Sequence, residues 1–314
     1  MRVLVYGAGV LGSLYGAKLR AAGHAVTILA RGHRFQFICE NGIVLMDGYG
    51  EHRTEHEIPV VDRLDPNDPY DLILVFLRKH QIASILAELA ASSAPDILFM
   101  GNNVRGPDDF VDALGSERVL MGFPGAGGII EDEVVKYIDS DEGRDATWGV
   151  TIGELDGGFT PRLERIRSLF KKASIPVELS HNIYAWVLTH AAIVLPIAHA
   201  LYLVEGGTLE LADRPDVLRL LIFAIREGLS VQETLGIPVI PRSVRMYKWV
   251  PSWVTSTVMR ARFSTRMAEI GIEGHALAAQ DEMAALAAEY AELMRRAGIQ
   301  TPALRTLYNT QDEE

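Results

Sequence analysis

The stretch "VYGAGVLGSLYGA" near the N-terminus constrains the fold more than any other part of this 314-residue sequence. It places Gly7, Gly9 and Gly12 in the spacing G-x-G-x-x-G. The glycines follow an apolar run, residues 1–7, that is typical of a buried strand, and they open a segment with the apolar spacing of a helix. A second apolar run, residues 25–30, completes a strand–helix–strand unit, and such units form parallel sheets.

Each glycine of this loop has a physical task in dinucleotide binding. Gly7 permits the tight turn, Gly9 lets the backbone approach a pyrophosphate, and Gly12 lets the helix pack closely on the strand. The N-terminus of the helix offers unpaired N–H groups and a positive dipole to phosphates. A purely structural glycine turn is the alternative. We predict that the loop binds a dinucleotide through Gly7, Gly9, Val10, Leu11 and Gly12.

The residues after the second predicted strand indicate which dinucleotide is bound. An acidic residue there would bond the ribose 2′-hydroxyl of NAD. The sequence instead reads "LARGHR", with Arg31 at that position and His33 and Arg34 after it. Because a cation suits a 2′-phosphate, we predict NADP(H) as the cofactor. His33 and Arg34 could also belong to a solvated loop.

The alternation of strand and helix patterns continues along the chain. Strands are predicted at residues 70–78, 96–101 and 118–125, paired strands within 128–155, and a short strand at 175–180. The intervening segments, among them 80–93 and 160–173, have helical spacing. After Ser180 strand signals nearly vanish, so we place a domain boundary near residue 179.

Composition excludes several classes of function. The formal net charge of −11 argues against a nucleic-acid partner, because phosphate-backbone binding needs a basic surface. The single cysteine, Cys39, excludes an intrachain disulfide and a cysteine-rich metal site, and no metal site is predicted. We see no signal peptide, because glycines follow the first apolar run at once. A cytoplasmic location is expected.

Several motifs together resemble those of the ketopantoate reductase family, over nearly the full length of the chain. They are the glycine loop, "LARG", "FLRKHQ", "FMGNN", "GFPGAGG" and "TIGELDGG". The resemblance implies a Rossmann domain with a doubly wound, mainly parallel α/β sheet at residues 1–179, and an all-α domain for substrate binding and dimerisation at residues 180–314. It also implies an active site between the domains and NADPH-dependent reduction of 2-dehydropantoate to pantoate, in pantothenate biosynthesis.

The resemblance carries cofactor-binding and catalytic roles to individual residues. Leu77 and Arg78 match a leucine and a lysine near the cofactor, with arginine replacing lysine. Asn102 matches the asparagine that contacts cofactor and substrate, although Asn103 stands where the family has glycine. Glu282 matches a glutamate that contacts the cofactor.

The stretch 182–204 has no Asp, Glu, Lys or Arg and aligns with the interdomain helix of the family. That helix carries a proton-donating lysine and two substrate-binding asparagines, and the matching residues here are His190, Val194 and Ala198. We predict that His190 faces the cleft and serves as the proton donor, and that His199 is a packed histidine. The length of the stretch would also allow a membrane span, but two histidines and Pro196 favour a buried core helix that forms one wall of the site.

The segment from Lys248 to Phe263, with two tryptophans and two arginines, has three possible roles: a surface for a partner chain, a lid over the cleft, or internal helix packing. For the whole protein we predict an NADPH-dependent oxidoreductase acting on a 2-oxo acid or a related small ketone. The loss of the asparagines leaves open a more apolar ketone or imine as substrate, and a non-catalytic NADP-binding sensor. We expect a small-molecule carbonyl substrate and a possible homodimer, with no nucleic acid or membrane partner.

Overall fold

The computed structural model describes residues 1–50, 52–139 and 149–309. The chain divides into two compact units. The first comprises Met1–Gly101 and Gly106–Tyr184, and the second comprises Asn102–Arg105 and the chain from Ala185 onward. The domain boundary predicted near residue 179, where the strand signals end, stays a prediction.

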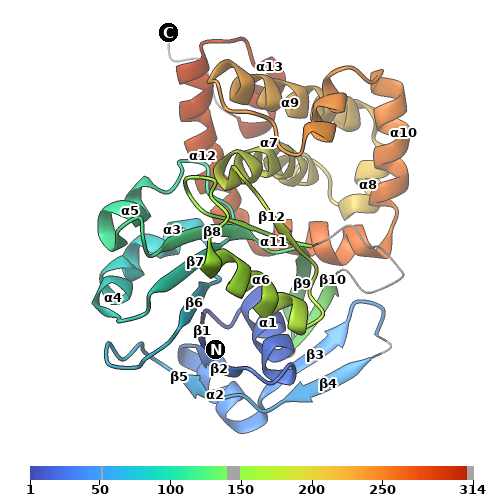
Figure 1. Ribbon diagram of the computed structural model, residues 1–314. Coiled ribbons are helices and arrows are strands. Elements are labelled where there is room, and N and C mark those ends of the chain that lie inside the picture. The colour runs from blue at the N-terminus through green and yellow to red at the C-terminus, as the bar shows by residue number, and fades with distance from the viewer. Residues whose placement is uncertain (51, 140–148, 310–314) are drawn as a thin grey trace. The chain divides into compact units, whose positions relative to one another are not determined.

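An eight-stranded sheet forms the centre of the first unit, in the order β12-β11-β8-β7-β6-β1-β2-β5 (Figure 1). All neighbouring strands are parallel except β8 and β11. The chain runs outward from β1 in one direction and then returns to build the other half from β6, so the strand order reverses between these two strands. This is the doubly wound, mainly parallel sheet that the sequence predicts. The strands are β1 (Arg2–Tyr6), β2 (Ala25–Leu29), β5 (Val60–Val61), β6 (Leu72–Val75), β7 (Asp96–Met100), β8 (Val119–Phe123), β11 (Val150–Gly153) and β12 (Val177–Leu179).

Helices cover both faces of this sheet because its strands are apolar on both sides. Val3 and Val5 of β1 belong to one apolar core with α1 and α6, whereas Leu4 and Tyr6 belong to a second core with α4 and α5. Successive side chains of a strand point to opposite faces, so each strand contributes to both cores. The helical segments are α1 (Val10–Ala21), α2 (Gly32–Asn41), α3 (Lys79–Ile82), the 3-10 turn Ala83–Ile85, α4 (Leu86–Ala91), α5 (Asp108–Leu114) and α6 (Pro161–Lys172).

A smaller four-stranded sheet has the order β4-β3-β10-β9. The paired strands predicted within residues 128–155 are confirmed for β9 (Ala126–Glu131) and β10 (Val134–Asp139), and residues 140–148 lie outside the described part. The sequence patterns did not reveal β3 (Ile43–Asp47), β4 (Arg53–His56), β5 or α2. These elements are short, and β4 and α2 are mostly polar, so hydrophobic periodicity carries little signal there.

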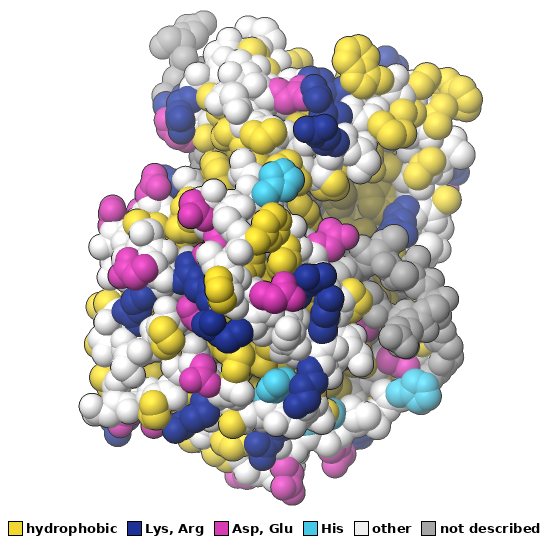
Figure 2. Space-filling view, viewed as in Figure 1, with side chains coloured by type: hydrophobic (Ala, Val, Ile, Leu, Met, Phe, Trp, Pro, Cys, Tyr) yellow, Lys and Arg dark blue, Asp and Glu magenta, His cyan; other side chains and the backbone are white. Residues whose placement is uncertain are grey.

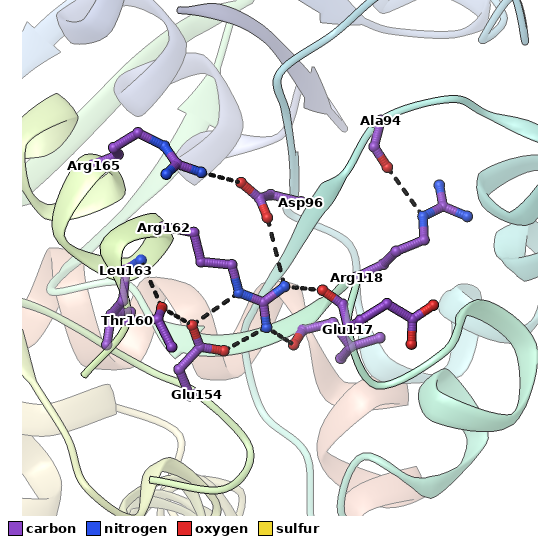
Figure 3. A network of polar contacts seen from close by, with 10 residues as sticks. Ala94, Asp96, Glu117, Arg118, Glu154, Thr160, Arg162, Leu163 and Arg165 are labelled. Carbon is purple, nitrogen blue, oxygen red and sulfur yellow. Dashed lines mark hydrogen bonds and ion pairs between the residues drawn. The ribbon is translucent and has the colours of Figure 1, made fainter. Parts of the chain in front are cut away.

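The motif "TIGELDGG" contributes Glu154 to a buried ionic network that connects α6 to the sheet (Figure 3). Glu154 follows β11 and accepts hydrogen bonds from the Nε of Arg162, at 2.8 Å, and from the hydroxyl of Thr160. The same guanidinium lies 3.5 Å from Asp96 at the start of β7. Burial raises the pKa of Asp96, while Arg162 and Arg165 act against that rise. This motif is therefore structural here.

The second unit has no strand among its described residues, as predicted, and its helices are joined by turns and loops. The helices are α7 (Ile183–Leu201), α8 (Gly207–Asp213), α9 (Pro215–Thr234), the 3-10 helix Arg242–Lys248, α10 (Ser252–Phe263), the π-helix Ala268–Glu273, α11 (Gly274–Ala278), α12 (Gln280–Ala297) and α13 (Pro302–Tyr308). Among the described residues α7 alone has the length and apolar composition of a membrane span, but most of it is buried inside the protein. It is a core helix, and its apolarity follows from burial on nearly all sides.

Candidate functional site

The glycine loop joins β1 to α1 with the geometry that the sequence predicts. Gly7 has a φ of +108°, which side chains rarely adopt, and a Cβ there would lie 2.5 Å from the carbonyl oxygen of Phe76. A Cβ on Gly12 would lie 1.8 Å from the carbonyl oxygen of Gly7. Both positions therefore exclude a side chain for reasons internal to the fold.

Gly9 differs from its two neighbours in the motif. A Cβ at Gly9 would meet no protein atom within 4 Å, and its φ is −69°. Nothing in the described protein therefore requires glycine there. The helix α1 begins at Val10, and no side chain caps its N-terminus. An open approach to an uncapped helix N-terminus suits the pyrophosphate of a dinucleotide, so the loop fits the predicted cofactor.

Arg34 braces this loop from α2. Its Nε donates to the carbonyl oxygen of Ala8 at 3.2 Å, and its Nη2 donates to the hydroxyl of Ser13 at 3.1 Å. Its Nη1 donates to the carbonyl and the carboxylate of Glu133, which lies in the turn between β9 and β10. His33 lies 2.9 Å from the same carboxylate. Since its side chain is only 15% exposed, Arg34 acts as an internal support and not as part of a solvated loop.

Arg31 lies at the N-cap of α2, at the carboxyl end of the sheet. Its Nη2 donates to the hydroxyl of Tyr6 at 2.7 Å and to the carboxylate of Glu88 at 3.1 Å. Tyr6 donates to the same carboxylate at 2.6 Å, and the amide of Leu64 donates to its other oxygen at 2.9 Å. Burial, reinforced by Glu88, raises the pKa of Tyr6 well above its usual range, so the phenol keeps its proton.

No sequence pattern indicates Tyr6, Glu88 or Glu133 as neighbours of the predicted cofactor site. Glu88 is 57 residues from Arg31 in sequence, and Glu133 is 99 residues from Arg34. Neither glutamate belongs to a motif. Only the tertiary structure brings these side chains together, with Glu88 on α4 and Glu133 in the turn between β9 and β10.

Leu77 lies beside the glycine loop, on the connection that follows β6, and Arg78 is the next residue of the chain. A Cβ placed on Gly7 would lie 3.0 Å from the Cδ2 of Leu77. Arg78 is half-buried at the N-terminus of α3. Lys79 is buried, with its ammonium group 4.6 Å from the centre of the Phe110 ring and 4.0 Å from Asp109. Of the two cations, Arg78 therefore remains the candidate for contact with the cofactor.

In the second unit, His190 lies on α7 and stacks on Trp186, with ring centroids 5.7 Å apart and an interplanar angle of 3°. Burial, and the proximity of His275, lower the pKa of His190 to about 4. The imidazole is therefore neutral near pH 7. The Nδ1 of His199 donates to the carbonyl oxygen of Leu195, and its ring packs against Tyr308, which confirms the prediction of a packed histidine.

Two further predicted site residues belong to the second unit. Asn102 directly follows the end of β7 and Gly101, and it is buried. Its Oδ1 has no hydrogen-bond partner in the described part of the chain, and such an oxygen is costly unless a ligand or water satisfies it. Glu282 is buried in the first turn of α12. Val194 is half-buried and Ala198 is buried, so α7 offers no polar group at these two positions.

The segment from Lys248 to Phe263 packs inside its unit through Thr255, Met259 and Phe263, but its two tryptophans do not. Trp249 is 82% exposed and Trp253 is 73% exposed, and Met246 lies in the preceding 3-10 helix with its side chain exposed. Figure 2 shows apolar side chains gathered over α10. The internal-packing interpretation is therefore wrong for both tryptophans. An apolar surface with exposed tryptophans is typical of a contact with a partner.

Comparisons with known proteins agree with this geometry. Residues 3–138 match the sequence profile of the family described as ketopantoate reductase PanE/ApbA. A 2-dehydropantoate 2-reductase from Halobacterium salinarum is 26% identical over 314 residues, which cover 98% of this chain and 96% of the relative.

Solved structures with low sequence identity share the fold. A 2-dehydropantoate 2-reductase from Geobacter metallireducens GS-15 superposes with a TM-score of 0.79 at 19% identity, covering 98% of each chain. A ternary structure of D-mandelate dehydrogenase with NADH and anilino(oxo)acetate superposes with a TM-score of 0.78 at 17% identity, covering 98% of this chain and 96% of that one. These similarities confirm the predicted fold class of both parts of the chain.

Proposed function

Because the chain is a divergent member of the ketopantoate reductase family, we propose that it is an NADPH-dependent oxidoreductase that reduces a 2-oxo acid or a related small ketone. Membership of this family confirms the predicted class, an oxidoreductase that interconverts C=O and CH–OH groups with a nicotinamide cofactor. The observation that carries the proposal is the glycine loop. A Cβ at Gly9 would meet no atom of the described protein, so the packing of the protein does not require glycine there. The absence of a side chain at this position leaves room for a ligand.

The cofactor-binding residues have complementary tasks in this proposal. The backbone from Gly7 to Gly12 holds the pyrophosphate at the N-terminus of α1. Arg31 binds the 2′-phosphate, and Leu77 and Arg78 contact the cofactor. Asn102 uses its unsatisfied Oδ1 as a polar contact to cofactor and substrate, and Glu282 contacts the cofactor. The bound cofactor supplies the hydride.

His190 exchanges the proton in this reaction. During reduction its imidazolium gives a proton to the carbonyl oxygen as the carbon receives hydride, and during oxidation its neutral ring removes the proton from the hydroxyl. A pKa of about 4 means that the neutral ring predominates near pH 7, which suits the oxidation of a hydroxy acid. We therefore expect kcat/KM for reduction to fall as pH rises above about 4, whereas kcat/KM for oxidation stays level over the same range.

The residues on α7 favour, as a second candidate, a substrate more apolar than 2-dehydropantoate. Val194 and Ala198 replace two amide side chains, and Trp186 lies flat against His190. A similar fold in D-mandelate dehydrogenase is bound to anilino(oxo)acetate, a 2-oxo acid derivative with an aromatic group. An aromatic 2-oxo acid is therefore the second candidate substrate. Apolar ketones and imines are included in the same substrate screen.

The same assignments give the two parts of the chain different binding roles. Residues 1–179 bind the dinucleotide, and residues 180–314 bind the substrate and contribute to a homodimer. The exposed tryptophans of α10 supply apolar surface for such a dimer. The protein acts in the cytoplasm on a small-molecule carbonyl compound, without a nucleic acid or membrane partner.

Titration with NADPH, followed by a screen of 2-oxo acids for loss of nicotinamide absorbance, tests the proposed function. Turnover of 2-dehydropantoate, together with rescue of a pantothenate auxotroph, would identify pantoate formation. Turnover of phenyl-substituted 2-oxo acids without rescue would favour the aromatic substrate. Tight NADPH binding with no turnover of any ketone or imine would contradict the enzyme and favour a nucleotide sensor.

A further inference from the structure

Two carboxylates surround the cations that the sequence assigns to the cofactor's 2′-phosphate. Glu88 pairs with Arg31 at 3.1 Å, and Glu133 pairs with Arg34 at 2.7 Å. With two arginines and two glutamates, the formal charges of this cluster cancel. The region after β2 therefore carries no net positive charge, unlike the cationic site that the sequence alone suggests. Net charge alone does not explain a preference for the 2′-phosphate.

Arg31 retains hydrogen-bonding capacity toward a ligand. Both of its hydrogen bonds leave from Nη2, and within the described residues its Nε and Nη1 have no partner. Its side chain is 55% exposed. The Nε–H and Nη1–H groups can therefore each donate a hydrogen bond to a phosphate, whereas both bidentate edges of the guanidinium include the Nη2 that Tyr6 and Glu88 already engage. Glu88 then remains hydrogen-bonded to the Nη2 of the same planar group.

Glu88 is fixed in this position by donors other than Arg31. The hydroxyl of Tyr6 and the amide of Leu64 donate to its two carboxylate oxygens at 2.6 and 2.9 Å. Tyr6 is buried, so its hydroxyl cannot follow a moving carboxylate into solvent. A bound phosphate therefore meets a stationary negative charge a few ångströms beyond Arg31, and like charges at that distance repel.

The origin of this carboxylate distinguishes the protein from the usual arrangement. Folds that bind NAD commonly carry an acidic residue at the end of the second strand, where it bonds the ribose 2′-hydroxyl. Here that position is Arg31, but Glu88 of α4 supplies a carboxylate 3.1 Å from its guanidinium. The cluster thus combines the cation expected for NADPH with the acid expected for NADH.

We propose that Glu88, held by Tyr6 and Leu64, sets the cofactor preference of this protein. Its charge weakens the binding of the 2′-phosphate to Arg31, so that NADH is accepted alongside NADPH. This inference rests on the proposed function, and it adds a specificity-determining residue outside the glycine loop. NADH has a neutral 2′-hydroxyl, so its binding is insensitive to the charge of Glu88.

The test compares the dissociation constants of NADPH and NADH, measured by nucleotide fluorescence, in the unsubstituted protein and in Glu88→Gln. Glutamine keeps an oxygen for the hydrogen bonds of Arg31 and Tyr6 but removes the charge. We expect NADPH to bind about tenfold more tightly in the variant, with the affinity for NADH changed less than twofold. Arg31→Gln should have the opposite effect on NADPH and should likewise leave NADH nearly unchanged.

Glu164→Gln serves as the matched control, because Glu164 is an exposed glutamate of α6 whose side chain pairs with Arg167. It removes the same charge and should change neither dissociation constant. An unchanged or reduced ratio of the two affinities in Glu88→Gln would overturn this inference while leaving the proposed function intact. If neither nucleotide binds the unsubstituted protein, both the proposed function and this inference are wrong.

Discussion

Arg34 donates a hydrogen bond to the carbonyl oxygen of Ala8, between the first two glycines of the cofactor loop. The hydroxyl of Ser13 donates to the same oxygen at 3.0 Å, so two side chains fix this peptide from different elements. Glu133 in turn holds Arg34 from the small sheet. The conformation of the glycine loop therefore depends on α2 and on the turn between β9 and β10, as well as on its own sequence.

Replacement of Arg34 by methionine should weaken NADPH and NADH equally, by about tenfold. Methionine keeps most of the length of the side chain but cannot hold the carbonyl of Ala8, so the loop loses its preorganisation for either pyrophosphate. The half-buried carboxylate of Glu133 also loses its cation, so the melting temperature should fall by several degrees. Paired titrations with both nucleotides check this, and a selective loss of NADPH would contradict it.

Gly9 and Gly12 should respond differently to alanine. Alanine at Gly12 places a Cβ 1.8 Å from the carbonyl oxygen of Gly7, so it should lower the melting temperature and abolish nucleotide binding together. Alanine at Gly9 meets no protein atom within 4 Å. It should leave the melting temperature within about 2 °C and still weaken NADPH by tenfold or more, because the new methyl group occupies the approach of the pyrophosphate. Calorimetry with NADPH titration separates the two effects.

His190 should make the protein less stable in acid. Its folded-state pKa of about 4 lies below the ordinary histidine value of 6.5. As pH falls below 6.5 the unfolded chain binds the proton first, so the free energy of unfolding drops until about pH 4, by about 3 kcal/mol. His190→Gln should lose correspondingly less stability between pH 7 and pH 4 in urea unfolding. An identical pH dependence in both proteins would show that His190 titrates normally.

Asn102→Ala should separate function from stability. The Oδ1 of Asn102 is buried without a hydrogen-bond partner in the described residues, so its removal takes away an unfavourable group, and the free energy of unfolding should change by less than about 1 kcal/mol. If Asn102 contacts cofactor and substrate, kcat/KM should nevertheless fall by about 100-fold. The buried neighbour Asn103 provides the comparison, since its alanine variant should lose stability. Unchanged kinetics for Asn102→Ala would remove it from the site.

The exposed tryptophans of α10 should govern self-association. Substitution of both Trp249 and Trp253 by serine removes the large apolar groups from this surface, and it should convert a homodimer to a monomer without loss of helix content. Light scattering during size-exclusion chromatography measures the mass, and circular dichroism controls for folding. A protein that is monomeric before substitution, or dimeric after it, would contradict a dimer contact at α10.

The sequence by itself determined the features that arise from local chemistry. The strand–glycine–helix pattern of residues 1–30 allowed only a narrow turn against a helix N-terminus, because glycine at residues 7 and 12 is the only residue that fits the backbone. Alternating apolar segments determined a parallel sheet, and the charge-free stretch 182–204 determined a buried helix. Short polar elements such as α2 and β4 carried no such periodicity and were missed.

Tertiary structure decided the electrostatics of the site, because charge interactions depend on distance in space and not on distance along the chain. The sequence placed a cation at Arg31 but could not show that a carboxylate from α4 lies 3.1 Å away. It placed a histidine at residue 190 but not the burial and the neighbouring His275 that lower its pKa. Residue type and spacing specify which groups can react, whereas packing decides which of them are charged, paired or exposed.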